Sequence, residues 1–293
     1  MAARQTLTHF WLKLLGTFSL VRGNNIALLA LTQYLIAYYI MAPEGPFRKV
    51  WFDLQLFCLV LASSLVVSAG YILNNFFDAA KDQINRPKKY LLRHLLSQRE
   101  QLTLFFILNM IAVIVAAAVS FKAVLFFGCY SLAIYAYSVF FKRLYWVSNG
   151  VAAFLVLLPF YVLALYYDFH ETTVYILAIY LFLLLLIRDL IKDLANYKGD
   201  FAQRYQTLPI VFGATKTKLI ISCIVFLAAI PLWYLLEVLT ASWRYFFLGS
   251  YPLLLILLPI LWRASTQKMY LWLHNIVKTL IFFGVLSIYW SNK

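Results

Sequence analysis

The sequence predicts an all-α polytopic membrane protein in which about nine transmembrane helices form one bundle. Of its 293 residues, 64% are hydrophobic and only 12% are charged. A soluble domain usually carries about 25% charged residues. The apolar residues form long continuous runs, whereas the strands of a membrane β-barrel alternate apolar and polar residues. Composition, charge and run length therefore all indicate membrane-spanning helices.

Nine apolar runs are long enough to cross a bilayer, which takes about 20 residues. They cover residues 24–42, 54–77, 101–119, 121–141, 149–167, 171–188, 217–238, 245–263 and 271–290. Residues 1–22 are mixed in character, and we expect them to lie as an amphipathic helix in the membrane interface. Because no Pro/Gly-rich linker divides the chain, we expect one domain over residues 1–293.

The basic residues predict the orientation in the membrane. The N-terminal segment and the loops after the second, fourth, sixth and eighth runs, counted together with Arg188, Lys218 and Arg263 at the adjoining ends of the runs, hold 19 of the 25 Lys and Arg residues. Cytoplasmic loops carry such an excess. We therefore expect the N-terminus and these loops in the cytoplasm and, with an odd number of spans, the C-terminus outside.

The net charge of +14 fits contact with anionic membrane lipids better than nucleic acid binding, which we do not expect. Three cysteines and four histidines are scattered along the chain. They have no spacing typical of a disulfide framework or a zinc site.

The first acidic motif follows the second run. Its residues Asn74, Asp78 and Asp82 are spaced by four, which stacks side chains on one face of a helix. Carboxylates stacked in this way repel each other. A divalent cation removes the repulsion, and an oxygen-only ligand set favours Mg²⁺, with Mn²⁺ as the alternative.

The second acidic motif follows the sixth run and repeats the pattern. Asp189, Asp193, Asn196 and Asp200 are spaced by four, three and four, so they share a face if the helix continues through Gly199. Five of the chain's 11 acidic residues lie in the two motifs. Ionisable groups are costly at a membrane, and this concentration favours a function over simple solvation.

Lys and Arg residues are interleaved with both motifs, and together with carboxylates and a divalent cation they favour a phosphorylated ligand. A diphosphate suits two motifs around bridging ions. The candidate cations for binding it include Lys81, Arg86, Lys192 and Lys198.

These residues resemble the UbiA-type family of intramembrane prenyltransferases. The first motif matches the family pattern with Asn74, Asn75, Asp78, Asp82, Asn85 and Pro87, and the second with Asp189, Asp193, Asn196, Gly199 and Asp200, followed by Thr207-Leu208-Pro209 and Gly213. Further matches are Leu20-Val21-Arg22 with Asn25, and Tyr137-Ser138 with Lys142-Arg143 and Asn149. Asn75 and Asn196 depart from the pattern, because many members have Asp there.

The resemblance implies roles for particular residues. Asp78, Asp82, Asp189 and Asp193 would hold Mg²⁺, with help from Asp200 and Asn74, and would be catalytic together with Tyr137. The diphosphate of an isoprenyl donor would be bound by Arg22, Asn74, Lys81, Arg86, Lys142, Arg143, Lys192 and Lys198. Ionisation of the donor would give an allylic cation, which the acceptor attacks as diphosphate leaves.

The acceptor is less closely specified. Arg188-Asp189 with Lys192-Asp193, then Gly199-Asp200 and Thr-Leu-Pro, looks most like digeranylgeranylglyceryl phosphate synthases. This resemblance implies a geranylgeranyl-type donor and a prenylglyceryl phosphate acceptor. Hydroxybenzoate or dihydroxynaphthoate, the aromatic acceptors of quinone pathways, are the alternative. A divalent-cation or solute carrier is the alternative of another class, although carriers usually place polar groups near mid-membrane.

Overall fold

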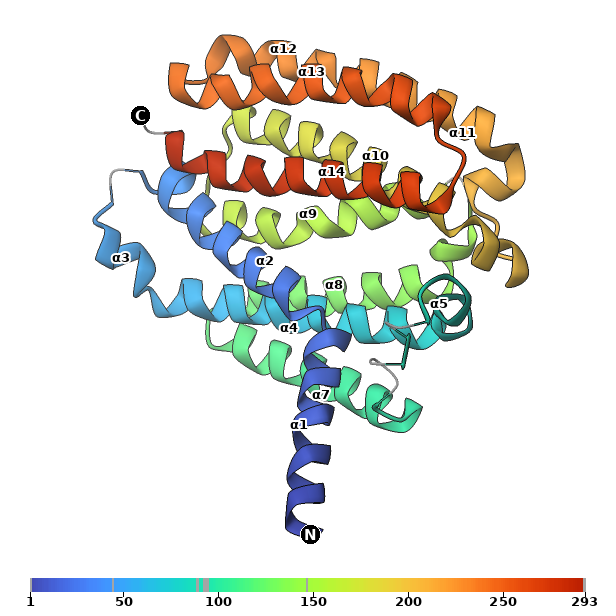
Figure 1. Cartoon of the computed structure of the whole chain (residues 1–293). Coiled ribbons are helices and arrows are strands. Elements are labelled where there is room, and N and C mark those ends of the chain that lie inside the picture. The colour runs from blue at the N-terminus through green and yellow to red at the C-terminus, as the bar shows by residue number, and fades with distance from the viewer. Residues whose placement is uncertain (1, 44, 88–89, 92–94, 146, 292–293) are drawn as a thin grey trace. The chain divides into compact units, whose positions relative to one another are not determined.

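The computed structural model of the protein describes residues 2–43, 45–87, 90–91, 95–145 and 147–291. Within these ranges the regular structure is entirely helical (Figure 1). The α-helices are α1 Ala2–Leu20, α2 Gly23–Ile36, α3 Phe47–Trp51, α4 Leu54–Phe77, α5 Ala79–Asn85, α7 Gln98–Ala117, α8 Phe121–Val139, α9 Ser148–Tyr166, α10 Thr172–Ala202, α11 Leu208–Leu227, α12 Ala229–Val238, α13 Ala241–Arg263 and α14 Gln267–Ser287. Three short pieces, the π-helix η1 and the 3₁₀ helices η2 and η3, cover Ala37–Met41, Phe141–Arg143 and Ile288–Trp290.

The helices confirm the predicted fold class. Eight helical segments of the described chain are long and apolar enough to cross a membrane. A ninth is added if the bent pair Trp11–Leu20 and Gly23–Met41, which meet at 55°, is taken as one span. The protein is therefore a multi-pass integral membrane protein.

Two predicted boundaries differ from the structure. The sixth run was expected to end at residue 188, but α10 continues through the second motif to Ala202. The seventh was expected to begin at residue 217, but α11 begins at Leu208 with Pro209 in its first turn. The first difference arises because hydropathy marks only the apolar part of α10, and the polar turns beyond it contain good helix formers such as Arg188 and Lys192. The second arises because Pro209 and Gly213 interrupt the apolar segment in the sequence, although α11 continues across the kink at Gly213. Proline is also well tolerated in a first turn.

The helices form two compact units, and each is described by itself. The first unit comprises residues 1–33 and 52–140. In it α4 packs against α7 and α8, and α7 packs against α8. Its buried cluster joins Leu20 of α1 to Ile72 of α4 and Phe105 of α7. A polar contact also joins α2 to α4. Gln33 of α2, which is fully buried, donates a hydrogen bond from Nε2 to the Ser63 hydroxyl of α4 over 3.1 Å.

The second unit comprises residues 34–51 and 141–293. Helix α10 is its centre and packs against α9, α11, α12 and α14; Figure 1 shows α14 in red alongside α10. Tyr180 of α10 is buried and hydrogen-bonded to Ser250 of α13 over 2.9 Å. The expectation that residues 1–293 form a single domain stays a prediction.

Gly213 produces a kink inside α11. Its φ of 81° and ψ of 166° lie in a region open essentially only to glycine. The carbonyl of Gly213 accepts a hydrogen bond from the Thr217 hydroxyl over 2.9 Å, which holds the turn after the kink. The kink separates the first turns of α11, which follow the second motif, from the apolar remainder of the helix.

The variant Gly213→Ala should lower the free energy of unfolding by about 1–3 kcal/mol, because a Cβ makes this backbone conformation strained. Thermal unfolding of the purified protein in detergent measures the change. Gly128→Ala is the matched control, because Gly128 is helical and a Cβ there meets nothing within 4 Å. Equal unfolding temperatures for the two variants would contradict the argument.

Candidate active site

The first motif lies at a one-residue break between two helices. Helix α4 ends at Phe77, α5 begins at Ala79, and Asp78 between them has φ −90° and ψ 4°. The four-residue hydrogen-bond pattern nevertheless continues across the break. The amide of Asp78 donates to the Asn74 carbonyl over 3.0 Å, and that of Asp82 donates to the Asp78 carbonyl over 2.8 Å. The predicted four-residue stacking of the motif is therefore retained by the backbone.

The motif's side chains lie at the edge of the first unit. Asn74, Asp78 and Asp82 are each half-buried, whereas Lys81 is buried at 8% exposure. Half-burial keeps the carboxylates accessible to a ligand while it strengthens their electrostatic interactions. Tyr137, also half-buried, lies on α8 of the same unit.

Two arginines share the region of the first motif. Arg22, at φ 54° between α1 and α2, places its guanidinium 4.6 Å from the centre of the Tyr71 ring. Arg86 interacts electrostatically with Asp82, Asp78 and Arg22. Burial lowers the pKa of Arg86, and the two carboxylates oppose this effect. Because arginine stays charged, the first unit brings two cations and two carboxylates into one neighbourhood.

Tyr71 joins this group through its hydroxyl, which accepts a hydrogen bond from Asn25 Nδ2 over 3.4 Å. The ring therefore lies between Arg22 and Asn25, both in the sequence segment around the α1–α2 junction. A guanidinium over an aromatic face is stabilised by the ring quadrupole. This contact orients Arg22 through the face of its guanidinium rather than through its N–H groups.

The second motif lies on one uninterrupted helix. Because α10 continues through Gly199, residues Asp189, Asp193, Asn196 and Asp200 share a helical face, as the sequence analysis required. Arg188 binds its neighbour Asp189 twice, with Nε and Nη2 at 3.0 and 2.9 Å from Oδ1. Asp200 is fully buried and Asn196 is 4% exposed. Asn196 and Asp200, near this end of α10, are therefore both buried, whereas Lys198 between them is exposed.

Asp193 is held by the start of α9. Asn149 Nδ2 donates to Asp193 Oδ2 over 2.9 Å, and the Ser148 hydroxyl donates to Asn149 Oδ1 over 2.9 Å. A hydrogen bond to one carboxylate oxygen orients the other and stabilises the charged form. Asn149 therefore orients Asp193, a candidate metal ligand, as residues that are hydrogen-bonded to metal ligands commonly do.

Two contacts were missed by the sequence analysis. His274 of α14 lies 3.2 Å from the Arg188 carbonyl through Nδ1, which must be the donor because a carbonyl only accepts. Gln101 of α7 accepts a hydrogen bond from Asn75 Nδ2 over 3.2 Å. No spacing within the motifs signals either partner, since both come from other helices.

The predicted residues divide between the units. The first unit contains Arg22, Asn74, Asp78, Lys81, Asp82, Arg86 and Tyr137. The second contains Lys142, Arg143, Asp189, Lys192, Asp193, Lys198 and Asp200. The side chain of Arg143 lies outside the described part of the structure. Lys198 is exposed, and Lys142 and Lys192 are half-buried.

Oxygen donors dominate both motifs, which suits Mg²⁺. Within the described ranges, no three or more His, Cys, Asp and Glu side chains gather as a metal-binding group. Mg²⁺ usually takes one or two protein carboxylates and completes its shell with water and substrate phosphates. The aspartate pairs and neighbouring amides therefore fit this ion without a complete protein cage.

Fold and motifs together define a polytopic membrane protein with paired aspartate motifs at helix ends. The profile of the UbiA prenyltransferase family matches residues 29–277. The chain belongs to this family and is a prenyltransferase. This assignment confirms the resemblance found in the motifs and replaces the carrier alternative.

Individual relatives agree. A digeranylgeranylglyceryl phosphate synthase of Thermococcus sibiricus is 33% identical over 208 residues, which are 70% of this chain and 71% of the relative. A solved digeranylgeranylglyceryl phosphate synthase structure aligns with a TM-score of 0.70 and 20% identity over 95% of this chain and 98% of the other. A UbiA homologue from Archaeoglobus fulgidus, bound to GPP and Mg²⁺, aligns with a TM-score of 0.65 and 16% identity over 93% and 99%. At these identities the two structures support the fold.

Removing the support of Asp193 should impair catalysis. We expect Asn149→Ala to lower the rate of prenyl transfer by about tenfold or more, the usual effect of losing a residue behind a metal ligand. Asn149→Asp should lower the rate further than Asn149→Ala, because it places a second carboxylate next to Asp193.

Turnover of the purified variants measures both effects. Asn109→Ala is the control, because Asn109 Nδ2 bonds only locally, to the Phe105 carbonyl of its own helix. Wild-type rates in both Asn149 variants would mean that this hydrogen bond does not support catalysis.

Proposed function

We propose that this protein transfers a geranylgeranyl-type isoprenyl group from its diphosphate to the hydroxyl of a prenylglyceryl phosphate and releases diphosphate. The observation that carries the proposal is the pair of aspartate motifs, each with cations around it, in a chain that belongs to the UbiA prenyltransferase family. The names of its relatives support the acceptor, since those in Haloquadratum walsbyi and Thermococcus sibiricus are both digeranylgeranylglyceryl phosphate synthases.

The reaction breaks the bond between C1 of the donor and the diphosphate oxygen, whose electron pair leaves with diphosphate. The acceptor oxygen bonds to C1 and loses its proton. Negative charge therefore develops on the leaving group, and fixed cations there lower the barrier. In the first unit Arg22, Lys81 and Arg86 supply positive charge, and in the second Lys142, Arg143, Lys192 and Lys198 do so.

The carboxylates have a different task. Asp78, Asp82, Asp189 and Asp193 would hold Mg²⁺, with Asn74 and Asp200 as further donors; bound Mg²⁺ neutralises diphosphate charge as a Lewis acid. Complexes of Archaeoglobus fulgidus UbiA homologues with Mg²⁺ and either GPP or DMAPP support this choice of ion. Mn²⁺ has similar ligand preferences and is expected to substitute.

Tyr137 and the membrane setting complete the proposal. Tyr137 offers an aromatic face that stabilises an allylic cation.

The positive-inside bias supports a cytoplasmic N-terminus and cytoplasmic motif loops, with the C-terminus outside. Residues 1–22 are proposed to lie in the interface, since Trp11, Leu15 and Phe18 of α1 are all more than half exposed.

Removing one carboxylate from either motif should abolish turnover without unfolding the protein. We expect Asp78→Ala and Asp193→Ala each to lower the rate by about 100-fold or more, because metal-ion stabilisation is worth several kcal/mol. Asp168→Ala is the matched control in a loop, with its side chain 94% exposed. Retained activity in both motif variants would contradict the proposal that these aspartates hold Mg²⁺.

The acceptor is tested by diphosphate release from geranylgeranyl diphosphate with purified protein. We expect release with geranylgeranylglyceryl phosphate and Mg²⁺, and none with excess EDTA. Hydroxybenzoate and dihydroxynaphthoate serve as alternative acceptors in the same assay. Faster release with either aromatic acceptor would contradict the proposed acceptor while leaving the prenyltransferase assignment intact.

A further inference from the structure

Asn75 belongs to the first motif, and its side chain faces the interior of the first unit. It is only 5% exposed, whereas Asn74 and Asp78 beside it are half-buried. Its Nδ2 donates to Oε1 of Gln101, a fully buried residue of α7, over 3.2 Å. The amide nitrogen of Asn75 is therefore bound to another helix inside the first unit.

The direction of this hydrogen bond is set by the backbone. Gln101 Nε2 donates to the Leu96 carbonyl over 3.0 Å, and a carbonyl can only accept. The oxygen of Gln101 must therefore face position 75, where only a donor satisfies it. An aspartate at 75 would set carboxylate oxygens against Gln101 Oε1 in a buried place, which is costly.

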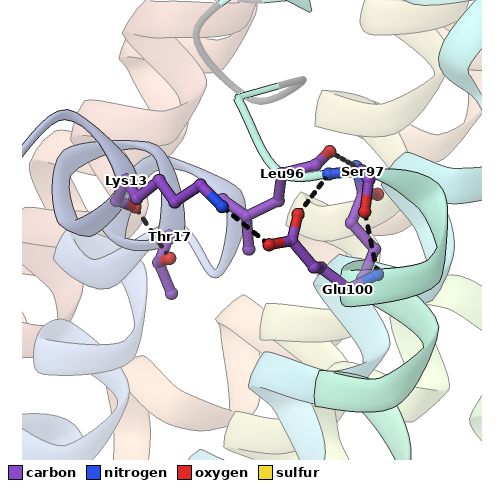
Figure 2. A network of polar contacts seen from close by, with 6 residues as sticks. Lys13, Thr17, Leu96, Ser97 and Glu100 are labelled. Carbon is purple, nitrogen blue, oxygen red and sulfur yellow. Dashed lines mark hydrogen bonds and ion pairs between the residues drawn. The ribbon is translucent and has the colours of Figure 1, made fainter. Parts of the chain in front are cut away.

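Gln101 itself is firmly anchored. Figure 2 shows the surrounding network at the start of α7. Ser97 and Glu100 form a capping box, in which Ser97 N donates to Glu100 Oε2 over 2.7 Å and Glu100 N donates to Ser97 Oγ over 3.2 Å. Lys13 of α1 pairs with Glu100 Oε1 over 2.7 Å. The first turn of α7 is thus a fixed support for the end of α4.

The direction of the Asn75 side chain determines the directions of its neighbours on the helix. Successive residues on a helix point about 100° apart, and residues four apart share a face. When Asn75 points to α7, the directions of Asn74 and Asp78 are set as well. We propose that Asn75 is a positioning residue rather than a metal ligand: through Gln101 it sets the rotation of the last turn of α4, and with it the aim of Asn74 and Asp78.

This inference rests on the proposed function, in which Asn74 and Asp78 serve Mg²⁺ and diphosphate. It makes a specific prediction, because Asn75→Asp adds a carboxylate that could serve as a ligand. If position 75 were a ligand, the variant would bind Mg²⁺ more tightly. If it is a positioning residue, the variant binds Mg²⁺ more weakly.

The experiment measures thermal unfolding of purified protein in detergent, with inorganic diphosphate, as Mg²⁺ is titrated. Unfolding in EDTA reports the stability of the fold separately. The variants are Asn75→Asp and Gln101→Leu, which breaks the same bond from the other side. Gln33→Leu is the matched control, because Gln33 is also fully buried and bonds α4 at Ser63, far along the helix from the motif.

We expect Asn75→Asp and Gln101→Leu each to raise the Mg²⁺ concentration for half-maximal stabilisation by about tenfold. Gln33→Leu should lower the unfolding temperature in EDTA but leave that concentration unchanged. Equal or tighter Mg²⁺ binding by Asn75→Asp, or an equal shift in Gln33→Leu, would overturn the positioning role alone. A wild-type protein with no Mg²⁺-dependent stabilisation would instead contradict the proposed function and the positioning role together.

Discussion

Electrostatic repulsion between carboxylates at the ends of membrane helices is the constraint on which this structure depends. Asp78 and Asp82, and likewise Asp189 and Asp193, are separated by one helical turn, where like charges destabilise a helix. The environment near a membrane has a low dielectric constant, so the penalty is larger there than in water. Five of the chain's 11 acidic residues lie in the two motifs. Such a concentration of charge requires compensating cations nearby.

The surrounding residues limit this repulsion. Arg188 neutralises Asp189 through two close contacts, and Asn149 holds one oxygen of Asp193. In the first unit Arg86 interacts with both aspartates of its motif, and Arg22 stacks on Tyr71 nearby. Amides provide much of the support because they donate hydrogen bonds to a carboxylate without adding charge. Buried networks of this kind specify one geometry, since any unmade hydrogen bond inside them is costly.

The sequence predicted the membrane helices and the shared helical face of each motif, but it did not predict the side chains from other helices that contact the motifs. Hydropathy located the spans because apolar length is a local property, but it placed the end of α10 at residue 188, where apolar character stops and the helix does not. The four-residue spacing found Asp78 and Asp193 because helical periodicity is also local. Gln101, Ser148 and His274 act from other helices, and nothing in their own neighbourhoods distinguishes them from ordinary packing residues. Asn75 departs from the family pattern in the sequence, whereas its buried hydrogen bond to Gln101 is visible only in the structure.

The central proposal is that each of the two aspartate motifs is needed to bind diphosphate together with Mg²⁺. A double-mutant cycle tests it most directly: calorimetric titration of inorganic diphosphate in the presence of Mg²⁺ into wild-type protein, Asp78→Asn, Asp193→Asn and the double variant. Residues that act on one shared ligand complex give strongly non-additive losses, whereas independent sites give additive ones. The account predicts that each single variant loses most of the affinity and that the double variant loses little more. Additive losses, or full affinity in either single variant, would contradict it.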